Sequence, residues 1–328
     1  MNAAIQSTNE TIPVSSKPTV VGWPHYTYEA ALAASDKIHW RVDDLIGEGK
    51  RLDFTKPFLP ESFARVEPLD FLSAREKLVL NQIRAHDYLY IFGLVEEFIL
   101  PFVLDQIRPL LRGPAIHNDA RVRALLAFAD EEAKHIELFK KFRENFLSSF
   151  GSNCEVIGPP EAIAEAILSK DPLAIALVIL HIEWMTQRHY LDSVVDDGKL
   201  DPQFKSLLRH HWMEESQHAK LDTLTVHAIC ETSTEQERDA CIDGYLEIGG
   251  MLDAGLAQQV KFDLESLQRA TGRVFTPEES QRFMTVQQQA TRWTFLGSGM
   301  THGNFLATAE LVKPGSRSRL EQVAPLFF

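Results

Sequence analysis

The stretch LLRHHWMEESQHAKL, residues 207–221, constrains the fold most because it puts three metal-binding residues on one side of a helix. His211, Glu215 and His218 stand at i, i+4 and i+7, so their side chains project from a single stripe. Leucines of the same stretch share that stripe, which predicts that it faces the core. A carboxylate that is buried without compensation is strongly destabilising, so such groups are paired, neutralised or bound to metal. A buried metal site is therefore the hypothesis to test.

A second Glu-x-x-His motif strengthens this hypothesis. One such motif is weak, because a chain with this many Glu and 12 His contains about one by chance. This chain has Glu132 with His135 and Glu215 with His218, in the sequences EEAKH and EESQH. Glu97 lies 35 positions before the first motif, and Glu183 lies 32 positions before the second. Four-helix bundles that bind two metal ions use one Glu from each of two helices and a Glu-x-x-His from each of the other two.

We predict Glu97 rather than its neighbour Glu96 as the inward residue of the first helix. Glu97 shares a helix face with Tyr90, Gly93 and Leu94, whereas Glu96 is rotated from that face by about 100°. The spacing to the first Glu-x-x-His motif also favours Glu97, although the rotation alone does not decide between the two. The predicted metal ligands are then Glu97, Glu132, His135, Glu183, His211, Glu215 and His218.

Charge and residue type indicate which metal fits these ligands. Four carboxylates carry a charge of −4, which two divalent ions neutralise. Imidazole and carboxylate together suit iron or manganese, and the lack of paired cysteines disfavours structural zinc. Glu131 and Glu214 are either solvated helix residues or acceptors of the second ring N–H of a ligating His.

The rest of the chain predicts helices around this site. Residues 1–24 should form a flexible N-terminal arm, and residues 25–328 a single helical domain. Within it, residues 73–230 hold the metal-binding bundle and residues 233–312 supply packing helices. A helix should also begin after Thr27 and end at Gly47. The period-two alternation typical of strands is absent from the sequence, which predicts an all-α fold.

Composition excludes several kinds of partner. A net charge of −13 argues against nucleic acid, which requires concentrated Lys and Arg. The longest apolar run, residues 173–180, is too short to span a bilayer, and no secretory segment is visible. Three cysteines at no paired spacing fit a reducing compartment. We therefore expect a cytoplasmic protein without a membrane partner.

These motifs resemble those of a known family. The doubled arrangement of Glu and Glu-x-x-His is similar to that of ferritin-like diiron carboxylate proteins. The added His211 in HHWMEESQH looks like the diiron N-oxygenases, typified by p-aminobenzoate N-oxygenase and the related arylamine oxygenase of chloramphenicol biosynthesis. The resemblance covers about residues 73–230. It implies a ferritin-like four-helix bundle with additional N- and C-terminal helices, and two iron ions, with manganese or a mixed pair as alternatives.

The resemblance also implies a function. It points to a homodimer that activates dioxygen and oxidises a small molecule at an amine nitrogen. An external electron donor is expected, because the sequence has no flavin, dinucleotide or cluster motif. Three alternatives stay open: a ferroxidase or peroxide-handling protein, a diiron hydroxylase that acts on carbon, and a non-enzymatic protein with a buried ion-pair network.

Overall fold

The computed structural model describes residues 24–112 and 119–328, and within these ranges all regular secondary structure is helical. The all-α prediction is therefore confirmed. The predicted N-terminal arm, apart from Pro24, lies outside the described residues.

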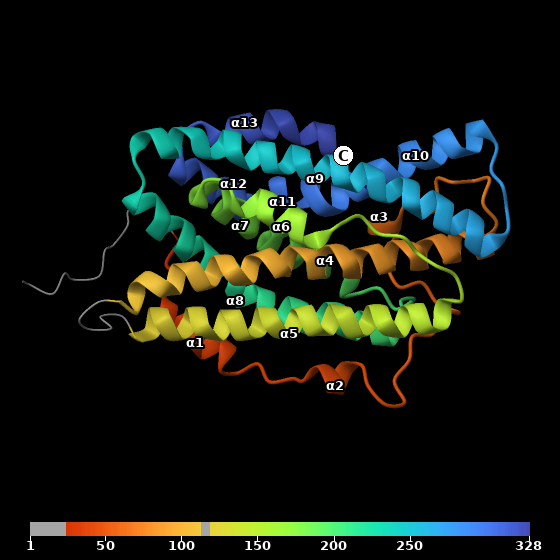
Figure 1. The fold of residues 1–328 in the computed structure, drawn as a ribbon, viewed down its shortest axis with the longest axis horizontal. Helices are drawn as coiled ribbons and strands as arrows, with labels where there is room; N and C mark the ends of the chain where they lie inside the picture. The colour runs from red at the N-terminus through yellow and green to blue at the C-terminus, as the bar shows by residue number, and fades with distance from the viewer. Residues whose placement is uncertain (1–23, 113–118) are drawn as a thin grey trace, which may run out of the picture.

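Four long helices form the bundle that the sequence predicts. They are α4 (Ala74–Leu110), α5 (Asp119–Phe150), α7 (Pro172–His189) and α8 (Pro202–Thr232). Helix α4 packs along α5, and α7 packs along α8 (Figure 1). Each of the four segments with a predicted ligand therefore lies on its own helix of one bundle.

Local sequence signals set where these helices begin. At the start of α4, the Ser73 hydroxyl accepts from the Glu76 N–H at 3.3 Å, and the Glu76 carboxylate accepts from the Ser73 N–H at 2.7 Å. This reciprocal capping satisfies two N–H groups that a helix start otherwise leaves unpaired. Helices α7 and α8 each follow an Asp cap, Asp171 and Asp201, with proline at the first helical position.

The N-terminal segment differs from its prediction. The single helix expected from Thr27 to Gly47 is two short helices, α1 (Tyr28–Ser35) and α2 (Val42–Leu45). The chain is extended at Arg41, whose N–H donates to Asp44 Oδ2 at 2.9 Å and so begins a new helix. Helix α1 packs against α5 and α8, and a further short helix, α3 (Glu61–Ala64), packs against α4 and α10 (Pro277–Arg292).

The remaining helices cover the bundle. Helix α9 (Glu235–Thr271) packs against α4 and α7 and lies above α4 in Figure 1. The others are α6 (Pro160–Leu168), the π-helix η1 (Tyr190–Val194), α10 (Pro277–Arg292), the π-helix η2 (Trp293–Gly297), α11 (Ser298–Met300), α12 (Gly303–Val312), α13 (Ser316–Val323) and the 3-10 helix η3 (Ala324–Phe327). Helix structure thus continues beyond residue 312, where the sequence prediction ended. None of the described helices combines the length and apolar character that a membrane crossing requires.

Candidate metal centre

Seven buried side chains from four helices meet inside the bundle. Glu96 comes from α4, Glu183 from α7, and the remaining five come from the two Glu-x-x-His helices: Glu132, His135, His211, Glu215 and His218. Two overlapping groups have ligand atoms that all lie within 4.8 Å of one another. One comprises Glu96, His135, His211 and Glu215, and the other Glu132, His135, Glu215 and His218. Glu183 borders the same closed space as Glu96, Glu132 and Glu215.

The prediction that Glu97 points into this centre is wrong. The Glu97 side chain is 34% exposed and forms an ion pair with Lys140 at 2.9 Å. Glu96 takes its place, with its Oε1 atom 3.0 Å from His211 Nε2. The other six predicted residues are brought together.

The error has a physical reason. Between residues 80 and 96 helix α4 is buried on every side, so an apolar stripe does not show which face meets the metal ligands. The face that reaches the centre carries Phe92, Glu96 and Ile99. The Tyr90 face, which suggested Glu97, turns elsewhere: the Tyr90 ring lies 4.7 Å from the Arg143 guanidinium on α5.

The contacts within the centre are short and focus on Glu215. Its Oε1 atom lies 3.0 Å from His135 Nδ1 and 2.8 Å from His211 Nε2, and its Oε2 atom lies 3.3 Å from His218 Nδ1. His218 Nδ1 also lies 2.9 Å from Glu132 Oε1. One carboxylate therefore touches all three imidazoles, which is the position of a group that could bridge two cations.

Several ligand atoms in this centre lack a hydrogen-bond partner among the described residues. They are both carboxylate oxygens of Glu132, one oxygen each of Glu96 and Glu183, and Nδ1 of His135 and His218. His218 and Glu132 approach closely but without hydrogen-bond geometry. Buried polar atoms are nearly always paired, so a cluster of unpaired ones requires an explanation. Two metal ions would satisfy these oxygen and nitrogen atoms together, and the residues present fit that group.

Glu131 and Glu214 bind the outer nitrogens of two imidazoles, which is one of the two alternatives that the sequence left open. His218 Nε2 lies 2.7 Å from Glu131 Oε2, and His135 Nε2 lies 2.8 Å from Glu214 Oε2. The pairing is crosswise, because each glutamate holds the histidine of the opposite helix. An Nε2–H donated to a carboxylate leaves Nδ1 deprotonated and free to bind a cation.

These two glutamates are themselves held in place. Ser35 of α1 donates to Glu131 Oε1, and Gln217 donates to Glu131 Oε2 at 3.2 Å. Lys134 forms an ion pair with Glu214 and also lies 4.2 Å from the centre of the Trp40 ring. The orientation of both imidazoles is therefore fixed by a network that reaches α1 and the segment before α2.

Burial raises the pKa of three of the carboxyl groups. It raises the pKa of Glu96 to about 8, against the opposing effect of His211. It raises the pKa of Glu132, and it raises that of Glu183 well above its ordinary value with a contribution from neighbouring Glu215. Without cations the centre therefore does not hold four ionised carboxylates, since desolvation makes such charge costly.

Two groups in the centre depart from this pattern. Burial alone would raise the pKa of Glu215, but attraction to His211 and His218 outweighs it and lowers that pKa well below its usual value. Burial opposes protonation of His135, but its hydrogen bond to Glu214 and the adjacent Glu215 carboxylate outweigh it and raise the pKa well above the ordinary value. Protons on the imidazoles can therefore supply the positive charge that metal ions would otherwise provide.

Three residues near the centre were not predicted from the sequence. Asp222 is buried and continues the stripe of α8 one turn beyond His218, so the same spacing rule could have found it. Burial raises its pKa well above the ordinary value. Trp40 stacks parallel to His135 at 6.1 Å, and Lys134 binds Glu214; both contacts join distant segments and no local pattern predicts them.

The centre is tightly enclosed. Phe92, Ile99, Ile182 and Thr186 close the space between the carboxylates, which leaves no room for a water molecule. A dry, apolar surrounding strengthens electrostatic interactions within it. Such a space can hold cations through direct bonds to the protein but has no bulk water.

Comparison with known proteins gives matches among solved structures only. No protein-family model matches the chain, and no curated protein matches its sequence. Among solved structures, the chain is similar to variants of an R2-like ligand-binding oxidase. One, with an aerobically reconstituted Mn/Fe cofactor, has 15% identity and a TM-score of 0.44 over 84% of this chain and 94% of that chain. Another, with an anaerobically reconstituted Mn/Fe cofactor, has 14% identity and a TM-score of 0.42 over 81% and 93%.

A third variant, with a non-activated Mn/Mn cofactor, has 14% identity and a TM-score of 0.42 over 83% of this chain and 92% of that chain.

Proposed function

We propose that this chain is a dinuclear metal oxygenase that uses dioxygen to oxidise a small molecule at an amine nitrogen. The observation that carries the proposal is the convergence of four glutamates and three imidazoles in one buried centre with unpaired ligand atoms; the glutamates are Glu96, Glu132, Glu183 and Glu215. Iron is the proposed metal, with manganese or a mixed pair as alternatives. The four carboxylates and two divalent ions form a neutral set, which removes the cost of burying either alone.

Different residues of the centre would bind each of the two metal ions. Glu96 and His211 would hold one ion, and Glu132 and His218 the other, on the two sides of Glu215. His135 lies within reach of both groups. Two metal ions, when bound, supply the electrons and the binding position that dioxygen needs. Glu131 and Glu214 would keep the Nδ1 atoms of their histidines directed at the ions.

The amine assignment depends on His211. This third imidazole is the feature that resembles the diiron N-oxygenases, and it lies buried against Glu96 and Glu215. Oxidation of an amine to a hydroxylamine consumes one dioxygen molecule, two electrons and two protons, and releases water. We propose an external electron donor, since no redox cofactor is implied by the sequence. A homodimer and a cytoplasmic location complete the proposal, and three free cysteines are compatible with a reducing compartment.

The test loads the full chain with ferrous iron in the absence of oxygen and then adds oxygen, a chemical reductant and p-aminobenzoate. We expect a product with oxygen on nitrogen, identified by mass spectrometry with isotopically labelled dioxygen. The Glu215→Ala variant should form none, whereas Glu97→Gln should form as much as the unmodified protein. An unchanged arylamine would refute N-oxygenation. Oxygen incorporated only at carbon would favour a hydroxylase, and many iron atoms retained per chain would favour a ferroxidase.

A further inference from the structure

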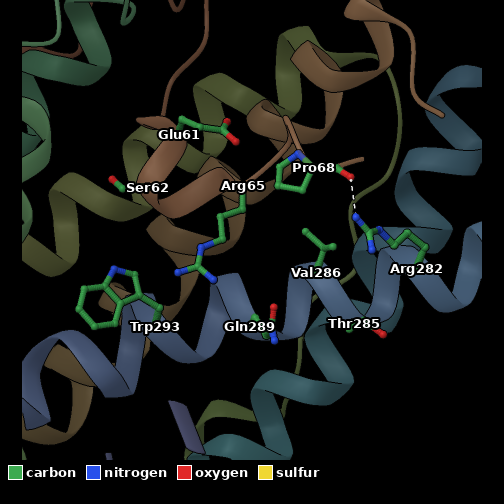
Figure 2. Close-up of a pocket in the computed structure, with 9 residues that line it drawn as sticks. All are labelled: Glu61, Ser62, Arg65, Pro68, Arg282, Thr285, Val286, Gln289 and Trp293. Carbon is green, nitrogen blue, oxygen red and sulfur yellow. Dashed lines mark hydrogen bonds between the residues drawn. The ribbon is translucent and has the colours of Figure 1, made fainter. Parts of the chain in front are cut away.

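A second pocket lies between α3 and α10 and shares no lining residue with the metal centre (Figure 2). Its volume is about 680 Å³, which is within the range of about 300–1,000 Å³ found for small-molecule sites. Glu61 and Arg65 line it from the α3 side, and Arg282, Gln289 and Trp293 from the α10 side. The pocket combines two guanidinium groups with an aromatic wall.

The guanidinium groups in this pocket are almost without partners. Arg65 forms no side-chain hydrogen bond or ion pair with any residue in the described ranges, and Arg282 has a single hydrogen bond, to the Pro68 carbonyl at 3.3 Å. The chain has 46 acidic and 33 basic residues, so an unpaired arginine has many potential partners. The one acid that lines the pocket, Glu61, accepts instead from the backbone N–H groups of Val66 and Glu67 at 3.2 and 2.9 Å.

The backbone at Arg65 is held in an uncommon conformation. Its φ of 42° and ψ of 49° are left-handed, and no other non-glycine residue in the described part of the chain has a positive φ. The Gln287 amide of α10 donates to the carbonyls of Ala64 and Arg65 at 3.0 and 3.2 Å and so holds this turn. Left-handed backbone at a residue other than glycine costs on the order of 1 kcal/mol and is concentrated at functional sites. Here it directs the Arg65 guanidinium into the pocket, toward Gln289 and Trp293, as Figure 2 shows.

Trp293 supplies a flat, apolar surface beside that guanidinium. It is partly buried and is fixed by an edge contact with Phe328 at 5.5 Å. An indole packs well against another planar ring, and a guanidinium binds carboxylate or phosphate through two parallel hydrogen bonds. The two groups together select for a ligand that has both a ring and a negative charge.

We propose that this pocket binds a small anion that carries a planar ring. Arg65 pairs with the carboxylate or phosphate, Trp293 covers the ring, and Arg282 attracts the ligand at the opposite end of the pocket. The site is separate from the metal centre and does not depend on the function proposed for it. Phe63 of α3 packs on His189 of α7 at a ring distance of 4.5 Å, so α3 contacts the bundle beside the pocket, and none of the residues that line the pocket belongs to the metal centre.

The test is calorimetric titration of the full chain with four probes: phenyl phosphate, benzoate, inorganic phosphate and benzyl alcohol. We expect saturable binding of at least one ring-bearing anion, at least about tenfold tighter than inorganic phosphate and benzyl alcohol, which corresponds to about 1.4 kcal/mol. The stronger of phenyl phosphate and benzoate identifies the anionic group. Absence of saturable binding of both ring-bearing anions at about 1 mM would overturn the proposal.

Three variants locate the binding. Arg65→Gln and Arg282→Gln should each weaken binding of the preferred anion by about tenfold. Trp293→Leu should remove the difference in affinity between the ring-bearing anion and inorganic phosphate. Arg75→Gln is the matched control, since Arg75 is an exposed arginine of α4 outside the pocket. Thermal unfolding shows whether each variant is folded, and Arg282, on the exposed side of α10, provides the decisive variant if Arg65→Gln does not fold. The proposal would be refuted if Arg282→Gln binds the preferred anion with unchanged affinity and if Arg65→Gln is folded and also binds it with unchanged affinity.

Discussion

Replacing Glu96 with glutamine should remove metal-dependent stability while leaving the metal-free protein intact. Burial raises the pKa of Glu96 to about 8, so its neutral form predominates by about ten to one at pH 7. Glutamine has nearly the same shape as that neutral carboxyl. We therefore expect the metal-free Glu96→Gln variant to unfold within about 1 kcal/mol of the unmodified protein.

The loss in the metal-loaded protein follows from binding linkage. Loss of an outer partner of a ligand already weakens metal affinity by about 10- to 100-fold, so loss of a ligand should cost at least about 100-fold. A metal at 100 times its dissociation constant stabilises by about 2.7 kcal/mol, and a site weakened 100-fold retains about 0.4 kcal/mol. The difference is about 2.3 kcal/mol. With about 2.1 cal/mol/K of unfolding entropy per residue and 328 residues, it lowers Tm by about 3 °C.

The assay is thermal unfolding of the unmodified protein and of Glu96→Gln, each with and without ferrous or manganous ions under argon. Elemental analysis measures the metal content of each protein. Glu97→Gln is the matched control, because Glu97 pairs with Lys140 on the surface and should retain two metal ions per chain. If Glu96→Gln keeps both ions and its metal-dependent shift in Tm, or if Glu97→Gln loses them, the assignment of Glu96 is wrong.

Three further predictions concern the surrounding structure. Glu131→Gln and Glu214→Gln should each weaken metal affinity by about 10- to 100-fold, measured by competition with a chelator; unchanged affinity would show that these hydrogen bonds do not orient the ligands. Phe204→Ala should lower the free energy of unfolding by about 3–5 kcal/mol in urea, because Phe204 is fully buried, and a loss below 1 kcal/mol would contradict that packing. Burial lowers the pKa of His189 to about 3, which is below the value of about 6.5 in the unfolded chain. The contribution of neutral His189 to the free energy of unfolding is therefore complete above pH 6.5 and is lost as the pH falls toward 3. The urea midpoint should therefore fall less steeply between pH 7 and 4 in His189→Gln, and parallel profiles would refute this.

The two Glu-x-x-His motifs were predictable because helix geometry alone relates their residues. Glu132 and His135 are one turn apart on α5, as are Glu215 and His218 on α8, so a single helix directs each pair to one side. The choice between Glu96 and Glu97 required the orientation of α4 relative to α5. Since α4 is buried all round at this level, that orientation comes from tertiary packing and leaves no periodic signal.

The pocket beside Arg65 could not be predicted from the sequence either, because it also depends on tertiary packing. It depends on the left-handed turn after α3 meeting α10 more than 200 residues later, through Gln287. Neither Arg65 nor Trp293 belongs to a motif of fixed spacing, so the sequence does not indicate that they meet. The break between α1 and α2 was missed although its cap is local. Arg41 does not cap α2 with its own side chain, so the only signal is the Asp44 carboxylate that accepts from the Arg41 N–H.

The most direct measurement of the central claim is anomalous X-ray scattering from crystals of the metal-loaded protein, collected at the iron and manganese edges. We predict two peaks about 3.5–4 Å apart, bound by Glu96, Glu132, His135, Glu183, His211, Glu215 and His218. Crystals that show no peak among these side chains, or show metal only at surface sites, would contradict the account.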